Sequence, residues 1–284
     1  MEPIFAFSPE KEVEETVKKT WNEFKSKLPS ILTLEQAKEI IFLHVFDDIF
    51  ENNGAKKYYT KKLGDLDYYF LRAANLHEQR NVSLDRFIPN SKFISDDNRF
   101  SPPGIEWIYL GISKNKRRAG RCCINECHAK VGDYFGLCEF EINTDFSDAP
   151  IVDLTVGMPK TYDEINDELN NSAQEEIEKS ALTFLATGDK NYLKTDLDFT
   201  KNIILQWYVQ IDTKMMSEQL FIPVEESEKG KEYLPFQWLA KYFLSLGFKG
   251  IIYKSAVYPI GKNLVLFDKS MVIPKTKKEF YIKA

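Results

Sequence analysis

Arginine and glutamate side chains in the middle of the chain, Arg72, Arg99 and Glu126 among them, are of types that could do chemistry on a phosphorylated substrate. Arg72 and Arg99 carry planar guanidinium groups, which bind phosphate oxygens through two parallel hydrogen bonds. Glu126 carries a carboxylate, which can stabilise the positive charge that develops on a sugar when its bond to a leaving group breaks. Together these residue types predict an anion-binding site with one acidic group.

Several common catalytic motifs are absent from the sequence. It contains neither the Gly-x-Gly-x-x-Gly turn of a dinucleotide-binding unit nor the Gly-x-Ser-x-Gly turn that presents a nucleophilic serine. Lys254 and Ser255 lack the glycine that precedes the lysine of a phosphate-binding loop. His77 and Glu78 lack the second histidine of a zinc protease helix.

The cysteines and a basic run each allow two interpretations. Cys122, Cys123 and Cys127 lie close to His128, but they lack the paired Cys-x-x-Cys spacing of structural zinc sites. We therefore expect buried thiols and no metal. The basic residues from Lys114 to Arg121 could attract phosphate or nucleic acid, and we interpret them instead as a solvated helix end.

The composition of the 284 residues is that of an ordinary globular protein, with 43% hydrophobic and 29% charged residues. The net charge of −5 disfavours general attraction to nucleic acid or anionic lipid. The longest apolar stretch, residues 40–50, is too short to span a bilayer, and the N-terminus lacks the basic region of a signal peptide. We expect a cytoplasmic protein with no nucleic-acid or membrane partner.

Residues 1–60 are predicted to form a helical hairpin. Ser8 and Pro9 are typical of a helix start, and apolar residues then recur every three or four positions up to Leu28. A second helix is predicted to open with a capping box at Thr33–Gln36 and to end near residue 53. Its inward residues are expected to be Ala37, Ile40, Ile41, Val45 and Ile49.

Beyond residue 61 the pattern alternates between strands and helices without regular βαβ units, which favours an α+β fold. Strands are predicted at residues 68–73, 107–111, 134–142, 251–253 and 264–267, the last two completing the chain. Helices are predicted at residues 172–187, 201–216 and 235–246, the last closed by Gly247.

An ordered series of segments resembles the RES domain, a family named for its arginine, glutamate and serine. The resemblance covers residues 67–268. The matching segments are Asn98-Arg99-Phe100-Ser101-Pro102-Pro103-Gly104-Ile105, Trp107-Ile108-Tyr109-Leu110-Gly111, Glu126, Val131-Gly132-Asp133-Tyr134, Gln237, the segment from Gly247 to Ser255, and Gly261-Lys262-Asn263-Leu264-Val265-Leu266-Phe267.

This resemblance implies a fold like that of ADP-ribosyl-transferring toxins, with central split antiparallel or mixed β-sheets flanked by helices. It implies two parts, an N-terminal helical segment (residues 1–60) and a catalytic domain that binds NAD⁺ (residues 61–284). Members of the family act on NAD⁺ as phosphorylases, glycohydrolases or ADP-ribosyltransferases, and many are toxins of bacterial toxin–antitoxin pairs.

The resemblance also implies two overlapping sets of site residues. The catalytic set is Arg99, Tyr109, Glu126 and Ser255. The set that binds NAD⁺ is Arg72, Arg99, Tyr109, Ser255 and Asn263. Two features depart from the family pattern: the spacing from Tyr109 to Glu126 is wider than expected, and Asn98 stands where glycine is frequent.

Each of these residues has a role that suits NAD⁺ cleavage. The arginines would bind the pyrophosphate or an attacking inorganic phosphate, and Glu126 would stabilise the cationic ribose. Tyr109 would stack on nicotinamide or ribose, and Ser255 would hydrogen-bond a phosphate or the nicotinamide amide. Nicotinamide leaves as a neutral molecule, so the reaction needs no general acid.

We therefore expect an enzyme that breaks the nicotinamide–ribose bond of NAD⁺, with phosphate or water as acceptor, and that serves as a toxin or defence effector. The alternatives are ADP-ribosyl transfer to a protein and a non-catalytic module that binds NAD⁺ or a partner. The expected partners are an antitoxin or regulatory protein and a second copy of the chain. The helical hairpin is either a docking surface for such a partner or a flank packed on the domain.

Overall fold

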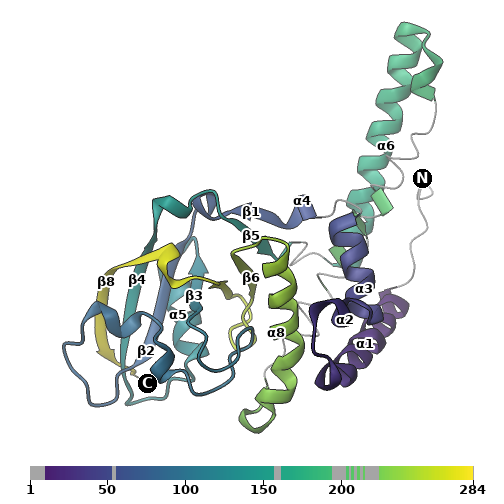
Figure 1. The fold of residues 1–284 in the computed structure, drawn as a ribbon. Coiled ribbons are helices and arrows are strands. Elements are labelled where there is room, and N and C mark those ends of the chain that lie inside the picture. Colours follow the sequence, from purple (N-terminus) through teal and green to yellow (C-terminus); the bar gives the residue numbers. More distant parts are fainter. Residues whose placement is uncertain are drawn as a thin grey trace. The chain divides into compact units, whose positions relative to one another are not determined.

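The computed structural model describes residues 10–52, 56–156, 161–193 and 224–283, together with residues 203–204, 206–207, 210–211 and 214. Within these residues the chain is an α+β protein (Figure 1). Its contacts divide it into two compact units. The first, here called the helical unit, comprises Met1–Phe24, Lys38–Tyr58 and Val156–Met216, and the second, here called the sheet unit, comprises Lys25–Ala37, Tyr59–Thr155 and Ser217–Ala284.

The two units are interleaved along the sequence. One change of unit falls between Tyr58 and Tyr59, close to the predicted boundary after residue 60. Residues 156–216 return to the helical unit, although they follow the first strands of the sheet. Packing groups the chain by position in space and not by sequence order.

The first helix of the helical unit follows the predicted apolar stripe. Helix α1 (Glu10–Lys27) buries Val17, Trp21 and Phe24, which recur at spacings of four and three residues. The expected helix start at Ser8 and Pro9 lies outside the described residues.

The second predicted helix is broken into two. The capping box is confirmed, because Thr33 Oγ1 accepts from Gln36 N at 3.2 Å and Gln36 Oε1 accepts from Thr33 N at 3.2 Å. Helix α2 (Leu34–Lys38) then ends, and the extended backbone of Ile40 separates it from α3 (Ile41–Asp47).

This break changes which side chains of α3 face inward. Ile41 and Val45 are exposed, so the prediction that they point inward is wrong, while Ile40 itself is buried. The extended residue rotates the second segment, and Phe42 packs its ring 5.1 Å from Trp21 and 5.3 Å from Phe24. A short π-helix (Asp48–Asn52) and α4 (Lys56–Tyr59) follow.

Helix α6 (Tyr162–Thr187) starts ten residues before the predicted position. Its first turn carries a capping box, in which Thr161 Oγ1 accepts from Glu164 N at 3.2 Å and Glu164 Oε2 accepts from Thr161 N at 2.6 Å. Tyr162, Ile165 and Leu169 pack against Trp207. Of the helix predicted at 201–216, only the few residues named above are described, and they are helical.

The sheet unit is built on one mixed sheet with the strand order β1-β5-β6-β7-β3-β2-β4-β8. All neighbouring strands are antiparallel except β5 and β6, which are parallel. The strands are β1 (Thr60–Lys62), β2 (Tyr69–Asn75), β3 (Ile108–Ser113), β4 (Tyr134–Ile142), β5 (Pro150–Asp153), β6 (Gly250–Lys254), β7 (Lys262–Leu266) and β8 (Val272–Tyr281).

The sequence-based prediction missed three of these strands. β1 and β5 are too short to show alternation. β8 was missed because it is an edge strand rich in lysine, with Lys275, Lys277 and Lys278 in its middle. Edge strands often carry charged residues that prevent pairing with another chain. The expectation that residues 264–267 form the last strand is therefore wrong.

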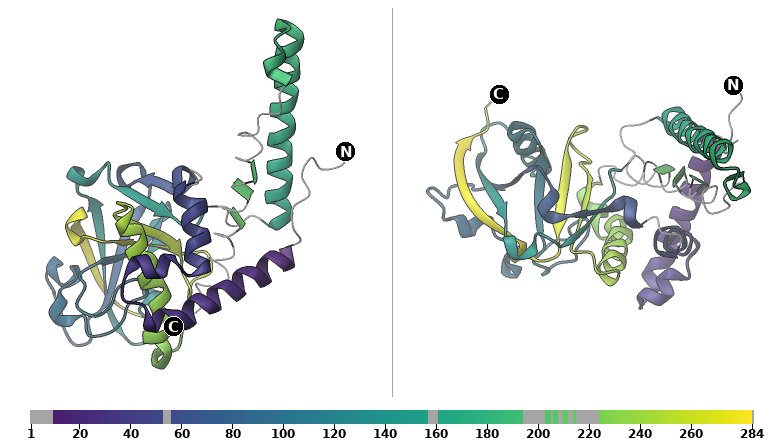
Figure 2. Two further views of the ribbon diagram at one scale, coloured as in Figure 1. Left: turned by 45° about the vertical axis from the view of Figure 1, so that its right-hand side comes forward. Right: turned by 90° about the horizontal axis from the view of Figure 1, so that it is seen from above.

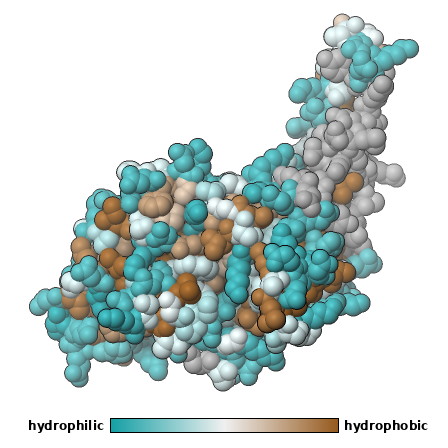
Figure 3. All heavy atoms as spheres, viewed as in Figure 1, coloured by the Kyte–Doolittle hydropathy of each residue, from teal (hydrophilic) through white to brown (hydrophobic). Residues whose placement is uncertain are grey.

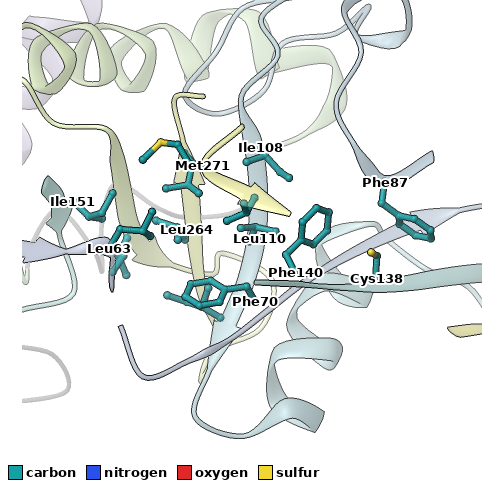
Figure 4. Close-up of a cluster of buried hydrophobic side chains, with 14 residues drawn as sticks. Leu63, Phe70, Phe87, Ile108, Leu110, Cys138, Phe140, Ile151, Leu264 and Met271 are labelled. Atoms are coloured by element: carbon teal, nitrogen blue, oxygen red, sulfur yellow. The ribbon is translucent and has the colours of Figure 1, made fainter. Parts of the chain in front are cut away.

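The two faces of the sheet are covered differently. On one face, Phe70, Leu110, Phe140 and Leu264 form the main core, which Leu63 and other side chains from short connecting segments cover (Figure 4). On the other face lies α5 (Lys116–Glu126), whose Ala119 and Cys123 pack on Leu71 and Ala73 of β2 (Figure 2).

Helix α8 (Lys229–Ser245) lies beside β6 (Figure 1). It starts six residues before the predicted first residue, Pro235, which is buried inside the helix. Its end is as predicted, because Gly247 follows in the left-handed conformation with φ +87°.

The face of the molecule drawn in Figure 3 carries both polar and apolar residues. Figure 3 shows hydrophilic residues over most of the visible face, with apolar side chains scattered between them. Within the described ranges, no helix combines the length and the apolar character needed to cross a membrane.

Two glycine-to-alanine substitutions should change stability in opposite directions. A Cβ at Gly111 would lie 2.5 Å from Cys123 Sγ and 2.9 Å from Ala119 O, so Gly111→Ala must push α5 off the sheet and should cost about 1–3 kcal/mol. A Cβ at Gly230, in α8, would meet only Asp97 Oδ2 at 3.6 Å, so Gly230→Ala should add about 0.5–1 kcal/mol. Denaturant unfolding followed by circular dichroism measures both. Equal effects of the two substitutions would contradict the close seating of α5.

Candidate functional site

The cavity of the sheet unit lies where two strands separate. β2 and β3 pair through only three residue pairs, ending at Leu71 and Gly111. Beyond this point β2 continues along β4, and β3 continues along β7. The space is a cavity of about 270 Å³, near the lower end of the range for ligand pockets.

Several elements line this cavity. β2 and β3 contribute Arg72, Ala73, Tyr109, Leu110 and Gly111, and the loop before β3 contributes Asp97, Asn98 and Arg99. The end of α5 contributes Cys123, Glu126, Cys127 and His128, and the remaining lining residues are Lys229, Tyr233, Tyr253 and Asn263. Five predicted site residues, Arg72, Arg99, Tyr109, Glu126 and Asn263, therefore lie around one cavity.

Arg72 is the first residue of β2 after its pairing with β3 ends, and its side chain lines the cavity. Burial lowers the pKa of its guanidinium, while Cys127, Cys123 and Tyr109 oppose that shift. Its Nη1 atom is buried and has no hydrogen-bond partner among the described residues. An unsatisfied buried donor costs about 1–3 kcal/mol. An anionic ligand in the cavity would remove that cost.

The loop that carries Arg99 is held at both ends. Asn98 and Ser101 exchange two backbone hydrogen bonds, of 2.9 and 3.3 Å. Gln237 of α8 donates to Asp97 Oδ1 at 2.8 Å and to Asn98 O at 3.4 Å. The turn and the glutamine together fix the backbone on both sides of the arginine.

Aromatic rings of α8 support the Arg99 side chain. Its guanidinium carbon lies 5.2 Å from the ring centroids of both Tyr233 and Phe236. A planar guanidinium is attracted to the face of an aromatic ring, so these two contacts help to fix the side chain. The geometry suits phosphate binding.

Tyr109 connects β3 to the same loop. Its hydroxyl is 2.9 Å from Ser101 Oγ and accepts from Phe100 N at 3.3 Å. Burial raises the pKa of this phenol, so the hydroxyl stays neutral. The tyrosine therefore helps to place the Arg99 loop, and the stacking role assigned from the sequence stays a prediction.

Glu126 is the last residue of α5 and is held by two neutral donors. Its Oε1 atom accepts from Ser255 Oγ and from Asn263 Nδ2, both at 2.6 Å. The C-terminal end of a helix carries partial negative charge and disfavours a carboxylate. The two hydrogen bonds offset this effect and fix the carboxylate in one orientation at the edge of the cavity.

Ser255 acts on Glu126 and does not line the cavity. It is buried, and its Oγ atom accepts from Tyr258 N at 3.0 Å and from Val257 N at 3.3 Å. These two donors direct the hydroxyl proton toward Glu126. The structure thus gives Ser255 a positioning contact, and direct binding of NAD⁺ by its hydroxyl stays a prediction.

The thiols near the site attach α5 to the sheet. Cys123 Sγ donates to Leu71 O at 2.9 Å, and Cys127 Sγ lies 3.6 Å from Ala73 O. The expectation of buried thiols is confirmed for Cys122 and Cys123 and wrong for Cys127, which is exposed. In the described part of the chain, no three His, Cys, Asp or Glu side chains are grouped so that they could hold a metal.

The basic run lies apart from the cavity. Lys114, Lys116, Arg117, Arg118 and Arg121 are all exposed, and none of them lines the cavity. Lys116 pairs with Glu139 at 2.5 Å and Lys114 with Asp67 at 3.5 Å. The expectation that this run is solvated is confirmed, and the run covers the first turns of α5, which the sequence-based interpretation described as a helix end.

Some cavity residues were not found from the sequence. Lys229 and Tyr233 belong to the first turns of α8, which the prediction began at Pro235. Tyr253 pairs with Asn263 between β6 and β7, but in the sequence pattern it was assigned only to a core strand. His128 has a positive φ of 49°, which is uncommon for a residue other than glycine. No sequence signal marks that conformation.

Comparisons with known proteins identify neither a family nor a function for the chain. No protein-family model and no curated protein matches the sequence. A chain from the crystal structure of the M. tuberculosis MbcT–MbcA toxin–antitoxin complex aligns over 83% of this chain and 93% of its own length, with 9% sequence identity and a TM-score of 0.34. A TM-score this low does not establish a shared fold, so the functional assignment rests on the site.

Cys127 is an exposed residue, but its sulfur lies against Ala73 O and is shielded from solvent, so its alkylation should depend strongly on pH. Loss of solvent raises its pKa to about 11, so at neutral pH the reactive thiolate is scarce. The alkylation rate of the native protein should rise about tenfold per pH unit from pH 7 to 10, because each unit increases the thiolate fraction tenfold. Iodoacetamide labelling read by peptide mass spectrometry measures this rate. A plateau near pH 9 would contradict the raised pKa, and the same peptide in denaturant is the control.

Proposed function

We propose that the chain is an enzyme that cleaves the nicotinamide–ribose bond of NAD⁺, with a fold of the RES type. The observation that carries this proposal is the shared cavity of Arg72, Arg99 and Glu126. It brings two phosphate-binding guanidinium groups and one oriented carboxylate to the same space. NAD⁺ has the matching parts, an anionic pyrophosphate and a ribose that becomes cationic when nicotinamide leaves.

The proposed reaction follows from these charges. The bond between ribose C1′ and the nicotinamide nitrogen breaks, and the electron pair leaves with the nitrogen, so nicotinamide departs neutral. Glu126 stabilises the oxocarbenium-like ribose. An oxygen of water or of inorganic phosphate then bonds to this carbon, which is numbered 1″ in the products. Water gives ADP-ribose and releases a proton, and inorganic phosphate gives ADP-ribose 1″-phosphate.

The two arginines would hold the anionic end of the substrate in this reaction. Arg72 Nη1 is the buried donor that an oxyanion would satisfy. Arg99 is fixed by its loop and by the Tyr233 and Phe236 rings. Binding remote from the reacting carbon positions the ribose against the carboxylate and contributes to catalysis.

The direct test is nicotinamide release by the purified chain of 284 residues incubated with NAD⁺, with and without inorganic phosphate. We expect release, with products resolved by chromatography. Phosphate-dependent release identifies a phosphorylase, and phosphate-independent release identifies a glycohydrolase. Transfer of label from NAD⁺ to protein would instead identify an ADP-ribosyltransferase. Calorimetric binding of NAD⁺ without any release would overturn the enzymatic proposal in favour of a binding module.

Two substitutions in the cavity should affect different kinetic constants. In Glu126→Gln the amide oxygen can still accept from Ser255 and Asn263 but carries no charge, so kcat should fall about 100- to 1,000-fold with little change in KM. Arg99→Lys removes the planar donor pair, so KM should rise at least about tenfold. Steady-state kinetics separates these effects.

Matched controls use exposed residues outside the cavity. Glu175→Gln in α6 and Arg117→Lys in α5 make the same chemical changes at exposed positions. Both should leave kcat and KM within about twofold of the unsubstituted values, as expected for exposed sites away from the substrate. Unchanged kinetics in Glu126→Gln would refute the role of the carboxylate.

We further propose that this activity makes the chain a toxin or defence effector that depletes NAD⁺ and is restrained by an antitoxin or regulatory partner. Induced expression in a bacterial cell should lower total NAD⁺ and stop growth, because turnover of the cofactor outpaces its synthesis. Expression of Glu126→Gln at the same level should do neither. Normal growth and NAD⁺ content with the active enzyme would contradict the depletion role without affecting the proposed reaction.

A further inference from the structure

Cys122 contacts one of the two side chains that donate hydrogen bonds to Glu126. Asn263, in β7, uses its Nδ2 group on Glu126 Oε1 at 2.6 Å. Its other amide atom, Oδ1, accepts a hydrogen bond from Cys122 Sγ at 3.3 Å. Cys122, Asn263 and Glu126 thus form a continuous chain of hydrogen bonds that runs from the middle of α5, through β7, to the end of α5 at the cavity.

The orientation of the Asn263 amide decides whether it supports or repels the carboxylate. The oxygen and nitrogen of an amide have nearly the same size, so packing alone distinguishes the two orientations poorly. With the amide turned around, Oδ1 would face Glu126 Oε1, and two acceptors would oppose each other. A donor on the far side of the amide disfavours that arrangement, because turning the amide would place its NH₂ group where the donor has its nearest acceptor.

Cys122 is well placed to be this donor. It is fully buried, and its sulfur occupies space that a glycine leaves open, since a Cβ at Gly261 would lie 2.7 Å from it. Lys262 O, at 3.7 Å, is a second and longer contact of the sulfur. Burial, together with the Glu126 charge, raises the pKa of this thiol to about 12, so it keeps the proton that it must donate.

We propose that Cys122 is a positioning residue, whose thiol sets the orientation of the Asn263 amide and through it the orientation of the Glu126 carboxylate. Its effect on catalysis rests on the proposed NAD⁺ cleavage, whereas its effect on the amide does not. Cys122 touches neither the cavity nor a substrate, so its loss should reduce the rate of the chemical step and leave binding unchanged.

The kinetic test compares three single substitutions. Cys122→Ala removes the donor, and Cys122→Ser keeps one. Cys138→Ala is the matched control, because Cys138 is also fully buried but belongs to the main core, where its sulfur contacts Glu139 O and not Asn263. A single hydrogen bond is worth about 0.5–1.5 kcal/mol, which corresponds to roughly 2- to 13-fold in rate.

We therefore expect Cys122→Ala to lower kcat for nicotinamide release by about 3- to 10-fold at unchanged KM. Cys122→Ser should recover most of this loss, and Cys138→Ala should stay within about twofold of the unsubstituted chain while losing similar thermal stability. Equal kcat values for the two alanine variants would overturn the proposal. The proposal would also be overturned if kcat fell as much in Cys122→Ser as in Cys122→Ala.

A second measurement does not depend on activity. The side-chain amide of Asn263 can be followed by NMR in the ¹⁵N-labelled chain and assigned by its loss in Asn263→Asp. Its proton bonded to Glu126 should resonate downfield of exposed amides in the unsubstituted chain and in Cys122→Ser, and should move toward the exposed position in Cys122→Ala. An unchanged signal in Cys122→Ala would refute the positioning role.

The two measurements separate the two proposals. If the chain releases no nicotinamide but the amide signal shifts as expected, NAD⁺ cleavage is wrong and the positioning of Asn263 stands. If the chain is active but neither the signal nor kcat responds to loss of the thiol, the positioning role is wrong and the proposed function stands. If Cys122→Ala does not fold, Cys122→Ser still tests the proposal. Loss of the downfield Asn263 amide signal in Cys122→Ser would contradict it.

Discussion

The separation of β2 from β3 is the constraint on which the site depends. Two antiparallel strands that stay paired leave no room between them, because their backbones lie about 5 Å apart. Here the pairing stops at Leu71 and Gly111, and each strand continues along a different neighbour. The next residue of β2, Arg72, lines the opening that results. A charged side chain in the middle of a sheet thereby gains access to a ligand.

Helix α5 closes one side of this opening, and small residues and thiols determine how closely it approaches. Gly111 offers no side chain where the helix crosses β3, and Cys123 fills the space with its sulfur. The thiols of Cys123 and Cys127 then hydrogen-bond to backbone carbonyls of β2. Because α5 packs this closely on the sheet, Glu126 at its end lies within hydrogen-bond distance of Ser255 and Asn263. The cysteines that resemble a metal cluster in the sequence are thus packing residues.

Basic and acidic groups from different elements meet around the cavity. Arg72 and Arg99 approach it from a strand and a loop, and Glu126 approaches it from a helix end. Neutral donors hold the carboxylate, and aromatic rings support one of the guanidinium groups. Because groups on separate elements are fixed before a ligand arrives, little reorganisation is needed when charge develops.

The sequence by itself determined the α+β class, the positions of the central strands β2, β3, β4, β6 and β7, and five of the side chains that line the cavity. The strands follow from local alternation of apolar residues, and the five side chains belong to the stretch, residues 67–268, that resembles the RES family. Only the tertiary structure decided the break between α2 and α3, the lysine-rich edge strand β8, and the use of Ser255 and Cys122 behind the cavity. Those features depend on which segments meet in space, and the hydrogen bonds of a hydroxyl or thiol with residues more than 100 positions away leave no periodic signal in the sequence.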